Sequence, residues 1–276
     1  MSKNDVTLVI GGNGKTGRRV AERLQNRGLP FRIGSRSGRP PFEWQARETW
    51  MPCLKGITQA YVTYYPDVCV PGALDTLQCF FTEAVNAGVR NLVFLSGRGE
   101  VQAEQAEELL KLSGANWTIL RCSFFSQNFS ENFFLDPITA GEVALPVRPV
   151  GEPFVDADDI ADVAVAALTD DRHSGQLYEL TGPRLLTFAE TVEEIARATK
   201  RDIRYLTVSP DAYRDGLIEA HVPDSVIELI LYLFRTVLDG RNEKIADGVQ
   251  RALGSQPREF KDYVQRTAAT GVWGGV

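Results

Sequence analysis

Residues 6–17 read VTLVIGGNGKTG, an apolar run that passes directly into a glycine-rich loop. The β-branched residues before the loop predict a short buried strand, and apolar residues at helical spacing predict a helix over 16–27 that Gly28 ends. A second short strand is expected at 30–34. Strand, helix and strand within about 30 residues form one βαβ unit.

The spacing of the glycines indicates what this loop binds. Gly12-x-Gly14-x-x-Gly17 is the pattern typical of dinucleotide-binding sites. The glycines allow a tight turn and let the backbone approach a pyrophosphate, while the helix N-terminus offers unpaired N–H groups. A phosphate loop of the ATPase type would need a glycine five positions before Gly14, where Val9 stands. The loop therefore predicts a nucleotide cofactor and disfavours an ATPase or GTPase.

The end of the second strand favours NADP(H) over NAD. Proteins that bind NAD place Asp or Glu there to hold the ribose hydroxyls. This chain has Ser35, Arg36 and Ser37 instead, with Arg39 close behind. A guanidinium and two hydroxyls suit the 2′-phosphate of NADP(H). The alternative is that Arg36 is a solvated surface arginine.

Strands continue to alternate with helices along the first 180 residues. This alternation predicts an α/β fold, a Rossmann-like doubly wound parallel sheet with helices on both faces. Phe42-Glu43-Trp44 is interpreted as an abbreviated third strand. The other expected strands are 60–63, 91–96, 117–121 and 176–180, and the expected helices are 71–87, 101–113 and 158–169. Ligands should bind at the carboxyl ends of the strands, where the first strand and the strand at 60–63 diverge.

The C-terminal third has a different character. Thr187 begins a helix with a capping box, and residues 209–270 are mostly helical in pattern. We therefore expect two domains: 1–180, an NADP-binding Rossmann-like domain, and 181–276, a smaller, mostly helical substrate-side region that closes over the cofactor. The apolar run 226–234 is either core or the surface of a homodimer.

Composition excludes several other classes. The net charge of −6 disfavours a broad nucleic-acid surface, and no run reaches the roughly 18 apolar residues of a membrane span. The N-terminus lacks a signal-peptide pattern, so a cytoplasmic location is expected. The four cysteines form no C-x-x-C pair, and His173 and His221 stand far apart. No metal site is expected.

Several motifs together resemble the NmrA-like branch of the atypical short-chain dehydrogenases/reductases. They include Gly11-x-x-Gly14-x-x-Gly17, the S-G-x-x-W-T-I-L-R run at 113–121 and V-D-x-D-D-I-A at 155–161. Gly-Lys-Thr in the loop and the 42–44 run lean toward the ergot-alkaloid reductases, such as agroclavine dehydrogenase. The family also contains NADPH-dependent quinone reductases and catalytically silent redox-sensing regulators.

The resemblance implies a set of site residues. The glycine loop would hold the pyrophosphate, and the end of the second strand would hold the 2′-phosphate. Trp44 would lie near the adenine, and the segment 64–66 would border the nicotinamide ribose. For the aromatic residues, plain core packing is the alternative. The implied cofactor-binding residues are Gly11, Gly12, Asn13, Gly14, Lys15, Thr16, Gly17, Ser35, Arg36, Ser37, Trp44, Tyr64, Tyr65, Pro66, Ser96 and Gly97; Phe125, Gln127 and Asn128 would line the substrate side.

One departure from the superfamily bears on catalysis. Its usual Tyr-x-x-x-Lys pair is absent, because none of the eight tyrosines has Lys four residues on. Ser96, Arg98 and Tyr64 are the remaining candidates for proton donation or anion stabilisation. We therefore expect an NADP(H)-dependent oxidoreductase that transfers hydride to a hydrophobic, electrophilic small molecule such as a quinone, activated alkene or iminium. The alternatives are a non-enzymatic NADP(H) sensor and, less favoured, an epimerase-like enzyme.

Overall fold

The computed structural model describes residues 5–274, and the chain divides into two compact units. The first unit contains the chain up to Cys122 together with 157–180 and 247–255. The second contains 123–156, 181–246 and the segment from Gln256 on. This division differs from the predicted boundary at residue 180, because the chain leaves the first unit after 122 and returns to it twice.

The first unit is built on a six-stranded parallel sheet of order β2-β1-β3-β4-β5-β7. Its β-branched and apolar strands are buried because helices cover both faces. The predicted doubly wound fold is confirmed. The strands are β1 (Thr7–Ile10), β2 (Phe31–Gly34), β3 (Gln59–Val62), β4 (Asn91–Gly97), β5 (Asn116–Cys122) and β7 (Gln176–Leu180).

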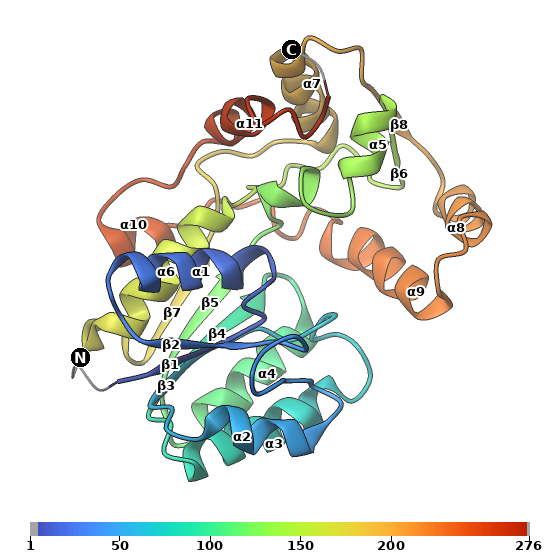
Figure 1. Ribbon diagram of the computed structural model, residues 1–276. Coiled ribbons are helices and arrows are strands. Elements are labelled where there is room, and N and C mark those ends of the chain that lie inside the picture. The colour runs from blue at the N-terminus through green and yellow to red at the C-terminus, as the bar shows by residue number, and fades with distance from the viewer. Residues whose placement is uncertain (1–4, 275–276) are drawn as a thin grey trace. The chain divides into compact units, whose positions relative to one another are not determined.

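The helices of the first unit form two layers (Figure 1). One face of the sheet carries α1 (Lys15–Asn26) and α6 (Ala157–Thr169), and the other carries α3 (Ala73–Asn86) and α4 (Val101–Lys111). Arg23 of α1 donates to the carboxylates of Asp158 and Asp162, which ties the start of α6 to the first βαβ unit. Two short helices complete the unit: α2 (Trp50–Leu54), and α10 (Gly248–Leu253), which packs on α6 and β7.

The predicted third strand at 42–44 is wrong, because these residues form a loop outside the sheet. The loop is anchored by its aromatic rings: Phe42 and Trp44 pack edge-on against Phe80, with ring centroids 5.8 and 5.1 Å away. The indole of Trp50 donates to the Glu43 carbonyl at 2.8 Å. In a sheet, the Glu43 carbonyl would accept a hydrogen bond from a neighbouring strand; in this loop it accepts one from the Trp50 side chain instead.

The second unit is mostly helical, as expected, and has one small parallel sheet that was not predicted. That sheet pairs β6 (Glu142–Leu145) with β8 (Arg204–Thr207). The two strands have only four residues each and are partly exposed, so apolar and polar residues do not alternate clearly enough in the sequence to predict them. The helices are α5 (Leu135–Ala140), α7 (Phe188–Thr199), α8 (Pro210–Glu219), α9 (Asp224–Tyr232) with a π-helical turn at Leu233–Val237, and α11 (Phe260–Ala268).

Phenylalanine rings dominate the core of the second unit. Phe129 contacts Phe134, Phe154, Phe188 and Phe260, with ring centroids 5.1 to 5.9 Å apart. The apolar run at 226–234 contributes Ile227, Ile230, Leu231 and Phe234 to buried positions, so part of that run lies in the core. Within residues 5–274, no helix is both long and apolar enough to cross a membrane.

Candidate functional site

The glycine loop lies between the end of β1 and the start of α1, as predicted. Gly14 is the N-cap of α1 and provides no side-chain cap, so the first-turn N–H groups are offered to a ligand. A Cβ atom on Gly17 would collide with the carbonyl of Gly11, so only glycine lets the helix begin this close to the loop. The loop therefore has the close helix–strand packing that brings a backbone against a pyrophosphate.

The sheet order places this loop at a topological switch point. β1 is hydrogen-bonded to β2 on one side and to β3 on the other, so the connections after β1 and β3 leave in opposite directions. Ligands of open parallel sheets bind at this position, beyond the carboxyl ends of the strands. The predicted switch point between β1 and β3 is present, and its role as the ligand site stays a prediction.

Side chains that the sequence assigned to the 2′-phosphate come together at the end of β2. The Asn13 amide donates to the hydroxyls of Ser35 and Ser37, each at 3.1 Å, and the two hydroxyls are 3.4 Å apart. Arg36 lies between the serines in sequence and is exposed. Within the described chain, its guanidinium has no hydrogen-bond or ion-pair partner. Two hydroxyls and an amide therefore gather where the acidic residue of an NAD site would stand, and the residue between the two serines is an exposed arginine.

The aromatic candidates differ in how accessible they are. Trp44 is 7% exposed and donates its indole N–H to the Thr63 carbonyl at 3.1 Å, so it is mainly a core residue. Tyr64 is half-buried with its ring 4.8 Å from that of Trp44, and Tyr65 is 70% exposed. The structure thus leaves the tyrosines after β3 accessible to a ligand and gives Trp44 a packing role.

Ser96, one of the catalytic candidates, is buried and already engaged. Its hydroxyl donates to Oε1 of Glu107 on α4 at 2.6 Å. Glu107 is fully buried, and Arg121 of β5 pairs with both of its carboxylate oxygens. The hydrogen bond to Glu107 raises the pKa of Arg121, which stays charged. Ser96 therefore helps to satisfy a buried ion pair between α4 and the sheet.

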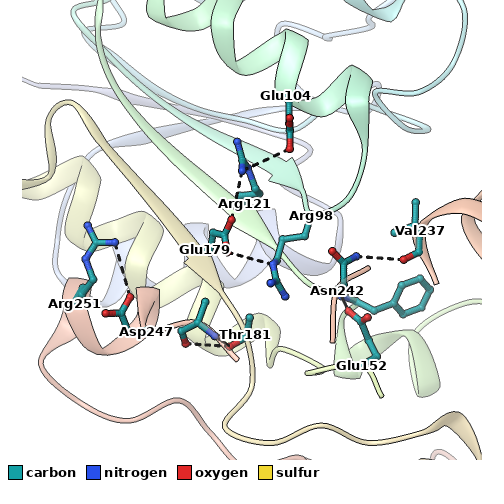
Figure 2. A network of polar contacts seen from close by, with 12 residues as sticks. Arg98, Glu104, Arg121, Glu152, Glu179, Thr181, Val237, Asn242, Asp247 and Arg251 are labelled. Atoms are coloured by element: carbon teal, nitrogen blue, oxygen red, sulfur yellow. Dashed lines mark hydrogen bonds and ion pairs between the residues drawn. The ribbon is translucent and has the colours of Figure 1, made fainter. Parts of the chain in front are cut away.

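Arg98, another candidate, is directed toward β7. Figure 2 shows Glu179 between two arginines, with Nε of Arg98 3.5 Å from one carboxylate oxygen and Nη1 of Arg121 3.4 Å from the other. Arg98 is only 6% exposed. This arrangement gives Arg98 a place in a charge network that spans β4, β5 and β7.

A third group of polar residues at the same edge was not predicted. Asp67 and Cys69 follow β3 and Glu100 follows β4, and one polar atom from each lies within 4.8 Å of the others. The Cys69 thiol donates to Oε2 of Glu100 at 2.7 Å, and the Cys69 N–H donates to Asp67 at 2.9 Å. Burial and the neighbouring Asp67 raise the pKa of Glu100 to about 8. No sequence signal marks this set, because Cys69 and Glu100 are 31 positions apart in different loops.

The predicted substrate-side residues lie in the second unit. Gln127 is 1% exposed, and its amide donates to Asp156 at 2.7 Å, while Arg266 donates to the other oxygen of Asp156 at the same distance. Gln127 is therefore part of the internal bracing of this unit. Phe125 and Asn128 are half-buried and retain surface that a ligand can contact.

Comparison with known proteins agrees with this geometry. The sequence profile of the NmrA-like family matches residues 102–267, more than half of the chain. The chain belongs to the NmrA-like family. The resemblance inferred from the motifs is thereby confirmed, including on the S-G-x-x-W-T-I-L-R and V-D-x-D-D-I-A segments that lie within the match.

Several relatives of this NmrA-like protein are named as reductases or dehydrogenases. It is 30% identical to the (4-alkanoyl-5-oxo-2,5-dihydrofuran-3-yl)methyl phosphate reductase of Streptomyces griseus, over 93% of this chain and 95% of the relative. It is 29% identical to agroclavine dehydrogenase of Claviceps fusiformis, again over 93% and 95%. The structure of an NADPH-dependent quinone oxidoreductase of Escherichia coli has the same fold, with a TM-score of 0.77, 16% identity and coverage of 95% and 99%.

Proposed function

We propose that this NmrA-like protein is an NADP(H)-dependent oxidoreductase that transfers hydride to a hydrophobic, electrophilic small molecule. The observation that carries the proposal is the polar group at the end of β2, where Asn13, Ser35, Arg36 and Ser37 stand in place of an acidic residue. A carboxylate there would repel a 2′-phosphate, whereas a guanidinium and hydroxyls can bind it. The names of the relatives support the reaction class.

The residues present fit this cofactor. The backbone from Asn13 to Thr16, at the start of α1, would hold the pyrophosphate, and the serines and Arg36 the 2′-phosphate. Bound NADPH supplies the hydride. The chain's part is to bind and orient the two reactants at the carboxyl ends of β1, β3 and β4, and to exclude water.

The acceptor class is inferred from the missing Tyr-x-x-x-Lys pair and from the hydrogen bond that already engages the Ser96 hydroxyl. Helix α4 carries no tyrosine and so provides no Tyr-x-x-x-Lys pair, and Ser96 is bound to Glu107. An unactivated ketone needs strong polarisation of its carbonyl oxygen during hydride transfer. Quinones, activated alkenes and iminium ions are electrophilic without it, and they are the acceptors that we propose.

The test is a cofactor titration followed by turnover. NADPH should bind more tightly than NADH, and loss of NADPH absorbance should follow addition of a quinone, an enone or a cyclic iminium. Equal affinity for the two cofactors would contradict the NADP(H) assignment. Tight binding without turnover of any acceptor class would contradict the reductase assignment.

The second candidate function is a non-enzymatic NADP(H) sensor. One observation favours it: Ser96 and Arg98 are both held in buried polar networks that leave them little freedom to act on a substrate. A sensor must distinguish the two redox states of its cofactor. An affinity that differs at least about tenfold between NADP⁺ and NADPH, equivalent to about 1.4 kcal/mol, combined with no turnover, would favour the sensor over the reductase.

A further inference from the structure

The unpredicted group after β3 and β4 lies at the ligand-binding edge of the sheet. β3 and β4 are adjacent strands, with Val62 in register with Phe94. Asp67 and Cys69 come shortly after the end of β3 and Glu100 comes three residues after Gly97, the last residue of β4. In a doubly wound sheet this edge faces the bound cofactor and its reaction partner. The group therefore lies on the side of the sheet where the chemistry of the proposed function would occur.

The carboxyl group of Glu100 is held in a defined position. It is folded back onto the end of β4, where a Cβ atom on Gly97 would collide with Oε1. The other oxygen, Oε2, accepts the hydrogen bond from the Cys69 thiol. The Glu100 side chain is 8% exposed, so it is largely, but not fully, withdrawn from solvent. Because the thiol donates to Oε2, the proton of a neutral Glu100 is carried by Oε1, the oxygen beside the Gly97 backbone.

The charges around Glu100 favour its protonated form. Burial disfavours the charged form of Glu100, and the neighbouring Asp67 disfavours it further through its negative charge and a hydrogen bond; together they raise the pKa of Glu100 to about 8. The Cys69 hydrogen bond acts in the opposite direction and is the smaller effect. Burial and Glu100 raise the pKa of Cys69 itself, so it remains a thiol. Arg98, two residues before Glu100, is directed to Glu179 on β7.

The three residue types can also bind a metal ion, but the geometry here is that of a hydrogen bond. Sγ of Cys69 and Oε2 of Glu100 are 2.7 Å apart. Two ligands of one metal ion, each about 2.0–2.3 Å from it, lie farther apart than this in a tetrahedral site. The separation of Sγ and Oε2 is that of a thiol–carboxyl hydrogen bond.

We propose that Glu100 is the proton donor of the reduction, taking the place of the missing tyrosine, and that Asp67 and Cys69 position it and set when it is protonated. The proposal rests on the proposed function. With a quinone, the C–H bond at C4 of NADPH breaks and its hydrogen and electron pair reduce the quinone to the hydroquinone monoanion. The O–H bond of Glu100 breaks, its proton completes the hydroquinone, and the carboxylate regains a proton from water.

A cationic acceptor separates hydride transfer from proton donation. Hydride transfer to an iminium or a triarylmethyl cation gives a neutral product without any proton. Loss of Glu100 should therefore slow the reduction of a quinone and leave the reduction of a cation intact. General acid catalysis typically contributes about 10²–10⁴-fold, which sets the expected size of the loss.

The experiment compares Glu100→Gln with wild type and with Glu108→Gln, a control on an exposed α4 residue that pairs with Lys111. The measured quantities are NADPH affinity and kcat for a benzoquinone and for a triarylmethyl cation. Glu100→Gln should lose at least about 10²-fold in quinone kcat, with cation kcat and NADPH affinity unchanged, while the control matches wild type. Quinone kcat that is unchanged, or a loss shared equally by both acceptors, would overturn the donor assignment.

The pH dependence gives a second readout. Wild-type quinone kcat should fall as pH rises through about 8, because Glu100 loses its proton there, and this inflection should be absent in Glu100→Gln. Asp67→Asn removes the neighbouring negative charge, so the inflection should move to lower pH. An inflection that survives in Glu100→Gln would overturn the proposal.

Failure of this proposal and failure of the proposed function give different results. A wild-type protein that reduces a quinone without any contribution from Glu100 is still a reductase. A wild-type protein that reduces only cations needs no proton donor, which overturns the assignment of Glu100 alone. A wild-type protein that binds NADPH and reduces neither acceptor overturns both.

Discussion

The side-chain amide of Asn13, in the glycine loop, donates a hydrogen bond to the hydroxyl of Ser35, just beyond β2, at 3.1 Å. This bond joins the two segments that would hold the pyrophosphate and the 2′-phosphate. Asn13, in the loop proposed to hold the pyrophosphate, thus orients the serine hydroxyls proposed to hold the 2′-phosphate. Asn13→Ala should weaken NADPH binding by about three- to tenfold, the equivalent of about 1 kcal/mol for a lost hydrogen bond. NADH binding should change less, and an equal loss for both cofactors in a fluorescence titration would argue against this link.

Arg36 is expected to determine the cofactor preference. A charge-assisted hydrogen bond contributes about 1.5–3 kcal/mol, so Arg36→Asp should weaken NADPH binding by about 10–100-fold and leave NADH binding equal or improved. Arg27→Asp is the matched control, because Arg27 is also exposed and follows the far end of α1. Isothermal titration of both cofactors measures the effect. Retention of the NADPH preference in Arg36→Asp would contradict the role of this arginine.

Gly17 should tolerate no side chain. Gly17→Ala places a Cβ atom against the Gly11 carbonyl, so it should abolish measurable cofactor binding and lower the free energy of unfolding by about 1–3 kcal/mol. Gly216→Ala, in the middle of α8, is the control: its Cβ meets nothing within 4 Å, and alanine is the better helix former. Urea denaturation should show the control equal to or more stable than wild type. Normal cofactor affinity in Gly17→Ala would refute the close-packing argument.

Ser96 is expected to act on stability more than on turnover. Ser96→Ala removes one hydrogen bond from buried Glu107, which keeps its ion pair with Arg121, so the free energy of unfolding should fall by about 1 kcal/mol. Glu107→Ala leaves Arg121 without this partner and should cost about 3–5 kcal/mol. Chemical denaturation measures both, and kcat for a quinone should stay within about threefold of wild type in Ser96→Ala. A large loss of kcat at unchanged stability would return Ser96 to the catalytic role that the sequence suggested.

The sequence predicted the features that depend on local pattern. A β-branched run, glycines at fixed spacing and an amphipathic helix lie next to one another in the chain, so the loop before α1 could be located without the structure. The capping box at Thr187 and Glu190 is local in the same way, and both of its hydrogen bonds are present. The loop at 42–44 was misread because its rings pack on Phe80, a residue of α3 that no local pattern connects to it.

Two parts of the site depend on contacts between distant segments. The sequence suggested a catalytic role for Ser96, but in the structure its hydroxyl is hydrogen-bonded to Glu107 of α4. Glu100 gave no signal, because the pairing of β3 with β4 is what brings Asp67 and Cys69 to it. Burial and neighbouring charge then raise its pKa, and neither is written in the residue's immediate sequence. A loop formed by one local segment is therefore easier to predict here than a polar group assembled from several segments.

The return of residues 247–255 to the first unit has a consequence for how the protein can be made. Helix α10 packs on α6 and β7, and those elements are themselves separated from the first five strands by residues 123–156. On the ribosome, the sheet cannot acquire its last strand until residue 180 has emerged, and it gains α10 only after residue 253. The first unit is therefore complete only after residue 253 has emerged. A fragment ending at residue 180 would expose the surface that α10 covers and should be recovered as aggregate.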